Sequence, residues 1–270
     1  MKLKSKVLIV AGSDSSGGAG IQADIKTVTV FGSYAMTAIT AITAQNTKGV
    51  KKIISIPKEV VKKQMTMILD DIGTHSVKIG MLHNTGIIKN IYSVLKKYKL
   101  KNIVLDPVMV AKGGAKLINN DSINHLRRFL IPKCTVITPN IPEAEILTGS
   151  SISSKEDMIK AAKKILNMGS KNVLLKGGHL KSKMIFDILA TKAGIKIFKK
   201  RKISTRNTHG TGCTLSTAIA TCLSQRKNIY NSCQISLKYV DRAISNSPGY
   251  GKGHGPLNHL VNFNLKNIYD

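Results

Sequence analysis

The sequence predicts an α/β protein, a three-layer α/β/α sandwich with a mainly parallel central sheet. Short apolar runs rich in β-branched residues alternate along the chain with longer amphipathic stretches. This alternation is typical of parallel strands joined by crossover helices. Residues of unusual chemistry follow the ends of several apolar runs, where open α/β sheets bind their ligands. No linker or repeat interrupts the pattern, so we expect residues 1–270 to form a single domain.

Nine short runs are predicted as strands because they are apolar, β-branched and bounded by turn residues. The last of them alternates isoleucine with lysine and leads into Lys199, Lys200, Arg201 and Lys202, which is typical of an edge strand protected by charge. The predicted strands are 7–11, 34–40, 53–56, 77–79, 102–105, 135–138, 173–175, 184–189 and 195–198.

Eight stretches have the apolar spacing of helices that bury one face. Pro57 and Pro142 lie near two of the predicted starts, and Lys96 and Lys97 lie near one predicted end, where cations are favoured. The predicted helices are 20–31, 58–72, 85–98, 122–130, 142–147, 155–168, 211–224 and 231–245.

Composition excludes several classes of protein. Hydrophobic residues make up 42% of the 270 residues, which is ordinary for a globular chain and too high for a disordered one. No apolar run reaches membrane-spanning length, and the short run after the basic N-terminus is a strand rather than a signal peptide. The four cysteines are too sparse and irregular for a disulfide framework or a zinc site. We therefore expect a cytoplasmic protein without a membrane partner.

The formal net charge of +28 raises the question of a polyanionic partner. The lysines are spread along every segment, however, and aromatic residues make up only 4% of the chain, with no tryptophan to stack on bases. A general enrichment in Lys, Ile and Asn explains the charge without a partner. We expect no specific nucleic-acid binding.

The most informative motif is the stretch 207–214, NTHGTGCT, which precedes a run of small helix-compatible residues. Gly210 and Gly212 permit a tight turn that exposes backbone N–H groups at the positive end of a helix dipole. With Thr211, they predict a cradle for a phosphate or an oxyanion. Cys213 in the first turn would have its thiolate stabilised by the same field, so we expect a lowered thiol pKa. The alternative is an ordinary helix start with a packed cysteine.

A second glycine-rich loop, residues 12–20, opens the first predicted helix. A dinucleotide site would need an acidic residue about 20 positions further on, and none occurs between Asp24 and Glu59. A Walker A motif is also excluded, because no Gly-Lys-Ser/Thr triplet is present. The loop is better suited to cup a small substrate, with Asp24 projecting toward it; the alternative for Asp24 is a solvated helix carboxylate.

Three further side chains follow predicted strands. Glu143 opens a helix three residues after Asn140, where it either complements the helix dipole or organises Mg²⁺ beside a polyphosphate. Asp106 follows another strand and fits the same metal role. Lys176 lies between a strand and two glycines, where it would neutralise phosphate charge.

Seven segments of the chain together resemble one protein family, in order. They are residues 11–24, 44–47, 78–82, 106–109, 138–144, 176–179 and 207–214. The chain is similar over residues 7–256 to the hydroxymethylpyrimidine/phosphomethylpyrimidine kinases of thiamine biosynthesis, members of the ribokinase-like superfamily. The cysteine at 213 is the specific feature, because related sugar kinases have aspartate there.

The resemblance implies a ribokinase-like fold and two successive ATP-dependent phosphorylations, of 4-amino-5-hydroxymethyl-2-methylpyrimidine and then of its monophosphate. It also implies a homodimer, since relatives are often dimers. Cys213 would accept the hydroxymethyl proton. The residues implied for the pyrimidine are Gln45, Asp24, Gly12 and Met81; those implied for the nucleotide are Asn140, Lys176, Thr211, Gly212 and Lys238; and those implied for Mg²⁺ are Glu143, Asn140 and Asp106.

Two other functions remain open on the sequence. A pyridoxal or pyridoxine kinase would share the reaction and the Gly-Thr-Gly-Cys ending, although Gln45 and Met81 favour an aminopyrimidine. A non-catalytic basic binding protein could retain the same fold, since fold alone does not guarantee activity. The full set of polar residues at the strand ends argues against the second.

Overall fold

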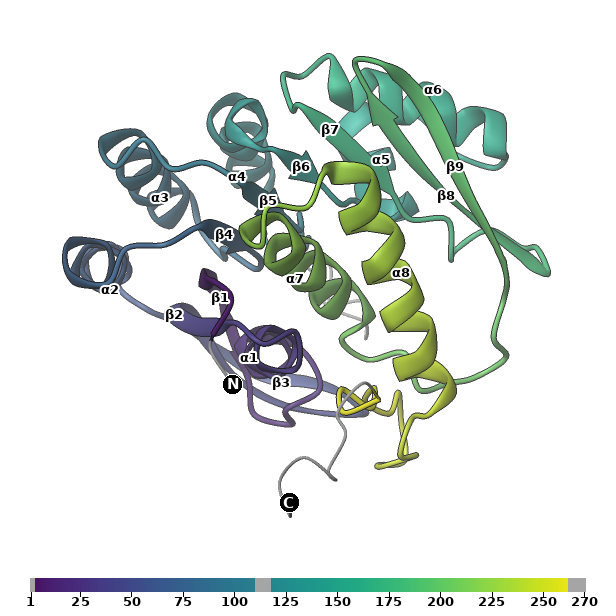
Figure 1. The fold of residues 1–270 in the computed structure, drawn as a ribbon, viewed down its shortest axis with the longest axis horizontal. Helices are drawn as coiled ribbons and strands as arrows, with labels where there is room; N and C mark the ends of the chain where they lie inside the picture. Colours follow the sequence, from purple (N-terminus) through teal and green to yellow (C-terminus); the bar gives the residue numbers. More distant parts are fainter. Residues whose placement is uncertain (1–2, 110–117, 262–270) are drawn as a thin grey trace.

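The computed structural model describes residues 3–109 and 118–261. Its nine strands form one sheet in the order β3-β2-β1-β4-β5-β6-β7-β8-β9 (Figure 1). Neighbours from β2 to β7 run parallel, whereas β3, β8 and β9 add antiparallel strands at the two edges. The strands are β1 Lys6–Asp14, β2 Tyr34–Asn46, β3 Gly49–Ser55, β4 Ser76–Ile79, β5 Ile103–Leu105, β6 Val136–Ile137, β7 Asn172–Leu175, β8 Met184–Thr191 and β9 Gly194–Arg201.

Helices cover both faces of this sheet. The helices are α1 Gly20–Val30, α2 Lys58–Asp71, α3 Thr85–Lys97, α4 Asn120–His125, α5 Ile141–Thr148, α6 Lys155–Leu166, α7 Thr211–Ser224 and α8 Ile229–Ser245. Figure 1 shows α1, α7 and α8 on one side of the sheet and α2 to α6 on the other. The predicted three-layer sandwich with a mainly parallel sheet is confirmed.

The period of two along the strands divides the core between these layers. On β1, Val7 and Ile9 point into the cluster shared with α1, α7 and α8, whereas Leu8 and Val10 point into the cluster shared with α2 to α6. Both faces of the strand are therefore buried, as expected for a parallel strand covered by helices. This rigid sheet fixes where the chain leaves each strand at its carboxyl end.

The predicted elements are present with small shifts at their ends, and two of them differ more. β2 continues six residues past the predicted end at Thr40 and forms a hairpin with β3 that reaches Gln45. The predicted helix 122–130 is divided into α4 and a π-helical turn, Leu126–Leu130, followed by a 3₁₀ turn, Ile131–Lys133. Its proline, Pro132, cannot continue an α-helix.

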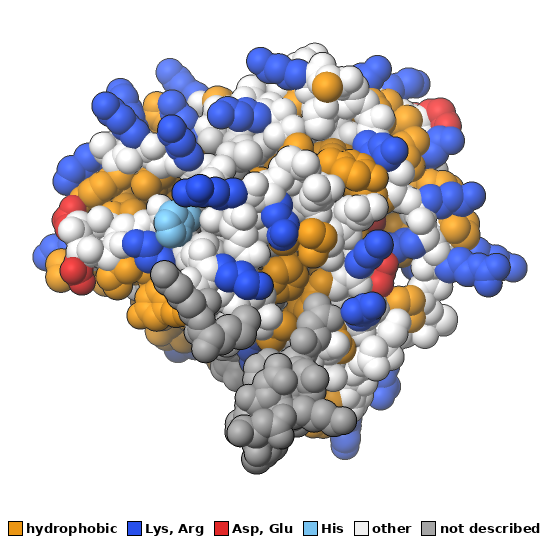
Figure 2. Space-filling model, in the orientation of Figure 1, with side chains coloured by type: hydrophobic (Ala, Val, Ile, Leu, Met, Phe, Trp, Pro, Cys, Tyr) orange, Lys and Arg blue, Asp and Glu red, His pale blue; other side chains and the backbone are white. Residues whose placement is uncertain are grey.

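Surface charge is dispersed. Figure 2 shows lysine and arginine side chains scattered over the visible face, with few acidic side chains among them. β9 is an edge strand of the sheet, as its lysines predicted. Among residues 3–109 and 118–261, no helix combines the length and apolarity needed to cross a bilayer.

Candidate functional site

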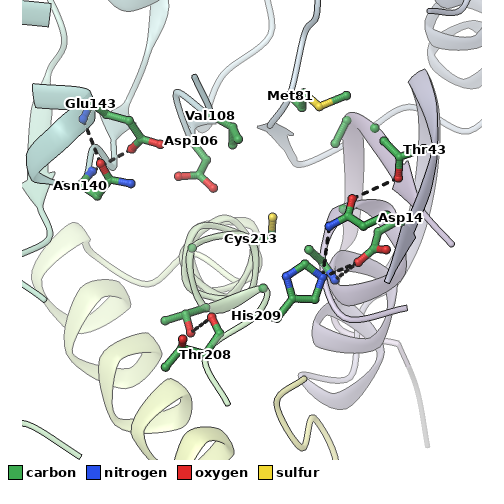
Figure 3. Close-up of a pocket in the computed structure, with 18 of the residues that line it drawn as sticks. Asp14, Thr43, Met81, Asp106, Val108, Asn140, Glu143, Thr208, His209 and Cys213 are labelled. Atoms are coloured by element: carbon green, nitrogen blue, oxygen red, sulfur yellow. Dashed lines mark hydrogen bonds and ion pairs between the residues drawn. The ribbon is translucent and has the colours of Figure 1, made fainter. Parts of the chain in front are cut away.

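A cavity of about 550 Å³ opens at the carboxyl ends of the parallel strands. It is lined by residues of β1, β2, β3 and β4, by residues that follow β4, β5, β6 and β7, and by the start of α7. Figure 3 shows Asn140 and Glu143 at one end, Asp14 and Thr43 at the other, and Cys213 between them. The predicted site residues that line it are Gly12, Gln45, Met81, Asp106, Asn140, Glu143, Lys176, Gly210, Thr211, Gly212 and Cys213.

The glycine turn before α7 has the geometry of an anion cradle. Gly210 caps the helix with φ 82°, a left-handed conformation that glycine adopts without strain. A Cβ at Gly210 would overlap the carbonyl oxygen of Gly18, so the first glycine loop lies directly against this turn. The N–H groups of the first helical turn have no acceptor within the helix. The Thr211 N–H donates to the Thr208 carbonyl at 3.4 Å, so the N–H groups of Gly212 and Cys213 are the ones available to an anion in the cavity.

Lys176 and Asp106 form an ion pair above this cradle. The Lys176 ammonium lies 3.0 Å from the Asp106 carboxylate, and both side chains are largely buried. A Cβ at Gly212 would lie 3.3 Å from Lys176 Nζ and 3.4 Å from Asp106 Oδ2, so the pair stands over the start of α7. Burial opposes the charge on Lys176, but Asp106 and Glu143 outweigh burial and raise its pKa. Lys176 is therefore a permanent cation beside the cradle.

Glu143 closes the first turn of α5. Its carboxylate accepts the Asn140 N–H at 2.8 Å, while the Asn140 side chain accepts the Glu143 N–H at 2.9 Å. This reciprocal capping box satisfies two backbone donors at the helix start. Burial raises the pKa of Glu143 to about 7; Asp106 acts in the same direction and Lys176 opposes it. Glu143 therefore caps the start of α5, and its metal role stays a prediction.

The opposite end of the cavity is organised by Asp14. Its carboxylate accepts hydrogen bonds from the Ser16 backbone and hydroxyl, from the Ala19 N–H, and from His209 Nε2 at 2.7 Å. Burial opposes its ionisation, but the bonds from His209 and Ser16 outweigh burial and lower the pKa of Asp14 to about 2. Gln45 Nε2 lies 3.4 Å from His209 Nε2, and Thr43 Oγ1 donates to Gln45 Oε1 at 3.1 Å.

The expected acidification of Cys213 is wrong for this structure. The thiol is half-buried on the first turn of α7. Burial raises its pKa to about 11, and the carboxylates of Asp24 and Asp106 add to the rise. Lys78 and the Gly20 N–H lower the pKa of the thiol, but by less than burial and the two carboxylates raise it. Desolvation and the two nearby negative charges therefore favour the protonated thiol at this helix start.

Asp24 also differs from its prediction. It is fully buried beneath the cavity rather than lining it, and its carboxylate lies 2.7 Å from the Lys78 ammonium. Thr217 of α7 donates to its other oxygen at 2.6 Å. This buried ion pair ties α1, β4 and α7 together, and it places Lys78 against the cavity floor.

Lys238 does not line the cavity either. Its side chain is exposed on α8. The helix is amphipathic, and position 238 lies opposite the buried stripe that Ser236, Leu237, Tyr239 and Val240 form at helical spacing. The predicted nucleotide contact has no geometric support at this position.

Sequence reasoning missed Lys78, Thr43, Asp14 and His209 as cavity residues. Asp14 and His209 were both inside recognised motifs, so only their pairing across 195 positions was hidden. Lys78 offered a usable signal, because a lysine in an otherwise apolar strand needs a buried partner. Thr43 lies on the part of β2 that was not predicted as strand.

The described residues contain no group of three or more His, Cys, Asp or Glu side chains suited to a metal ion. Asp106 and Glu143 both line the cavity. Mg²⁺ is commonly held by one or two carboxylates together with phosphate oxygens and water, rather than by an all-protein cage. The donor set therefore fits Mg²⁺ only when a polyphosphate supplies the remaining oxygens.

Comparisons with known proteins agree with this geometry. The family model described as "Phosphomethylpyrimidine kinase" matches residues 14–258. A hydroxymethylpyrimidine/phosphomethylpyrimidine kinase of Bacillus subtilis is 42% identical over 257 residues, covering 95% of each chain. The thiamine biosynthesis bifunctional protein ThiED of Geobacter sulfurreducens is 46% identical over 258 residues, but the present chain, 96% of which is aligned, spans 53% of that protein.

Solved structures give the same result. The phosphomethylpyrimidine kinase of Clostridium difficile superposes with a TM-score of 0.80 at 44% identity, covering 90% of this chain and 100% of that one. The pyridoxal kinase of Staphylococcus aureus in complex with AMP-PCP superposes with a TM-score of 0.90 at 32% identity, covering 98% of this chain and 96% of that one. The ribokinase-like fold is therefore confirmed, and the chain belongs to the phosphomethylpyrimidine kinase family.

Proposed function

We propose that this kinase uses ATP to phosphorylate 4-amino-5-hydroxymethyl-2-methylpyrimidine and then phosphorylates the resulting monophosphate to the diphosphate, for thiamine diphosphate synthesis. The observation that carries the proposal is the division of one cavity into two halves. Gln45, Met81 and Gly12 line one half, and Lys176 stands with the α7 cradle in the other. Relatives of nearly the same length bear the names of both activities.

The half lined by Gln45 suits a small aminopyrimidine. The Gln45 amide offers donors and an acceptor, which match a ring nitrogen beside an exocyclic amine. Met81 provides an adaptable apolar surface for the ring. Its methyl carbon lies 2.9 Å from the position of a Cβ at Gly12, so any side chain at Gly12 would displace Met81. We assign these three residues to the pyrimidine.

The other half suits the phosphates of ATP. One structural relative, the pyridoxal kinase of Staphylococcus aureus, has been solved in complex with AMP-PCP and in complex with ADP. Phosphoryl transfer depends on in-line positioning and on neutralising charge over the transferred group. Lys176 supplies a fixed cation, and the N–H groups of Gly212 and Cys213 supply donors, with Thr211 beside them in the same turn. Asn140 lies beside Lys176 in an isolated β-bridge and completes this half.

Mg²⁺ would enter this half with ATP. Asp106 and Glu143 are the carboxylates that would hold it, and it would supply positive charge that neutralises the phosphates. In its absence the Asp106 charge is balanced by Lys176. Because the pKa of Glu143 is raised to about 7, a nearby divalent cation would favour its ionised form.

Cys213 lies between the two halves, where the acceptor alcohol would meet the transferred group. We assign it as the acceptor of the hydroxymethyl proton in the first step. The thiol is protonated in the unliganded protein, so it must lose a proton before it can act as a base. A phosphate acceptor in the second step is already ionised near neutral pH and needs no such base.

Purified protein incubated with Mg-ATP and the hydroxymethylpyrimidine tests the assignment by mass spectrometry. The proposal expects both the monophosphate and the diphosphate. Pyridoxine and pyridoxal belong in parallel reactions, because the pyridoxal kinases of Bacillus subtilis and Staphylococcus aureus superpose with TM-scores of 0.89 and 0.90. Higher kcat/KM for pyridoxal than for the pyrimidine would favour that second function. ATP-independent, salt-sensitive nucleic-acid binding would favour a non-catalytic basic protein.

We also propose that the kinase is a single-domain homodimer in the cytoplasm. Ile42 of β2 and Ile54 of β3 pair across the hairpin, and they are 48% and 54% exposed. Two such apolar side chains on one face would be covered by a second copy. The cysteines are all free thiols, as a reducing compartment allows. Light scattering of the wild type and of Ile42→Glu/Ile54→Glu tests the dimer, and cell fractionation tests the location.

A further inference from the structure

Two loops from opposite ends of the sequence meet at one carboxylate. Loop 14–20 follows β1 and leads into α1, and loop 207–210 leads into α7. Asp14 Oδ1 accepts the Ser16 N–H at 2.8 Å and the Ser16 hydroxyl at 2.7 Å, and Asp14 Oδ2 accepts the Ala19 N–H at 2.8 Å. The same Oδ2 accepts a hydrogen bond from His209 Nε2 at 2.7 Å (Figure 3).

These bonds exclude Asp14 as a base. Its carboxylate accepts four hydrogen bonds, which occupy the lone pairs that would otherwise receive a proton. Its lowered pKa of about 2 agrees with this, since the bonds from His209 and Ser16 favour the ionised form despite burial. Because Asp14 is an acceptor, His209 Nε2 carries the proton that joins the two residues.

The contact between the loops is tight as well as polar. A Cβ at Gly18 would overlap His209 Cδ2, and a Cβ at Gly210 would overlap the Gly18 carbonyl oxygen. His209 directly precedes Gly210, the N-cap of α7. Gly20, at the end of loop 14–20, donates its N–H to the Cys213 sulfur. Movement of loop 14–20 would therefore shift the cradle and the thiol together.

We propose that Asp14 and His209 form a positioning pair that holds the pyrimidine half of the cavity in a fixed position relative to the phosphate cradle. Loop 14–20 borders the half that holds Gln45, because Ser15 and Gln45 exchange two hydrogen bonds, of 2.8 and 2.9 Å. Loop 207–210 sets the orientation of the α7 N–H groups. One hydrogen bond thus determines how the acceptor alcohol faces the phosphate that is transferred.

The kinetic part of this inference rests on the proposed function. Asp14→Asn and His209→Leu are expected to lower kcat for the first phosphorylation about 10²-fold, because a small misplacement of reacting groups has an effect of that size. The KM for ATP is expected to change less than about threefold, since Lys176 and Asn140 lie outside the two loops. His209→Gln keeps an N–H donor and should recover most of the rate.

The matched control is His125→Ala, which removes a His–Asp pair on the surface, since His125 lies 3.4 Å from Asp121. It is expected to leave kcat unchanged. The positioning role would be overturned, leaving only a general structural one, if the kcat of His209→Gln did not exceed that of His209→Leu. A rise in the KM for ATP as large as the fall in kcat would have the same consequence.

Hydrogen exchange tests the pair without turnover. In Asp14→Asn and in His209→Leu, amide protection is expected to fall together in residues 14–20 and 207–213, while that of α3 stays unchanged. Loss confined to the mutated loop would contradict the inference even in an active kinase. If the wild type is inactive toward the pyrimidine but both loops still lose protection together in the variants, the proposed substrate is rejected. The coupling between the two loops is then retained.

Discussion

The ammonium of Lys176 lies 3.0 Å from the carboxylate of Asp106, directly above the first turn of α7. The two residues follow different strands, β7 and β5, and are 70 positions apart. Their pairing means that the cation which would receive phosphate is already held in place before any nucleotide arrives.

Replacing Lys176 with methionine is expected to lower kcat by about 10² to 10³, the effect of removing one fixed donor to developing charge. The variant also leaves Asp106 buried without its cation, which destabilises the protein by a few kcal/mol in such cases. Steady-state kinetics and thermal unfolding measure both effects. Lys171→Met, a change at an exposed lysine near the start of β7, serves as the control for charge removal. Unchanged kcat in Lys176→Met would contradict the assigned role.

Cys213→Ala is expected to slow the first phosphorylation more than the second, because only the alcohol acceptor has a proton to lose. Since the pKa of the thiol is about 11, the rate of the first step should rise with pH between 7 and 9, while that of the second stays level. Separate assays with the pyrimidine and with its monophosphate give both profiles. Equal loss in the two steps would remove Cys213 from the proton transfer.

The rate of alkylation provides an independent measure of the pKa of the Cys213 thiol. Cys134, Cys222 and Cys233 are fully buried, and burial raises their pKa values as well, so iodoacetamide should modify Cys213 first. The rate of modification should increase steadily up to pH 10. A plateau near pH 7 would show that the thiol is acidic after all.

Gly210→Ala is expected to destabilise the protein more than Gly149→Ala. Both glycines have positive φ, 82° and 67°, so each substitution carries a backbone cost of about 1 to 2 kcal/mol. The Cβ at Gly149 meets nothing within 4 Å, whereas the Cβ at Gly210 overlaps the Gly18 carbonyl and adds about 1 to 3 kcal/mol. Urea unfolding of the two variants gives the difference. Equal values would mean that the loops are not in contact.

Glu143→Gln is expected to stabilise the protein above pH 7 and to change little near pH 4. The folded-state pKa of about 7 lies above the ordinary value of 4.5, so the wild type loses stability as pH rises from 4.5 to 7. Glutamine keeps the acceptor for the Asn140 N–H without the charge. The gain at pH 8 should be on the order of 2 kcal/mol. Chemical denaturation at both pH values measures it, and a loss of stability at pH 8 would contradict the raised pKa.

The sequence was sufficient for the layers, the strands and the position of the cavity. Buried parallel strands such as β1 are apolar on both faces, and Gly210, with its positive φ, marks the start of α7. Because parallel strands end at one edge of the sheet, motifs far apart in sequence had to converge there.

The pKa values and ion pairs of the site could not be predicted from the sequence. The pKa of Cys213 depends on how deeply α7 is buried and on the distances to Asp24 and Asp106, which are tertiary quantities. Asp24 was misplaced for the same reason, since its partner Lys78 is 54 positions away. The last residues of β2 were missed because hairpin pairing with β3, rather than local apolar pattern, makes them strand.

The central claim is that one cavity transfers phosphate to an alcohol and then to the phosphate it has just made. A time course with Mg-ATP and the hydroxymethylpyrimidine, followed by mass spectrometry and ADP release, tests it most directly. The account predicts that the monophosphate rises and then falls as the diphosphate forms, with two ADP released for each diphosphate. It also predicts that Lys176→Met slows both conversions. ATP consumption without phosphorylated pyrimidine, or diphosphate formation that survives unchanged in Lys176→Met, would contradict it.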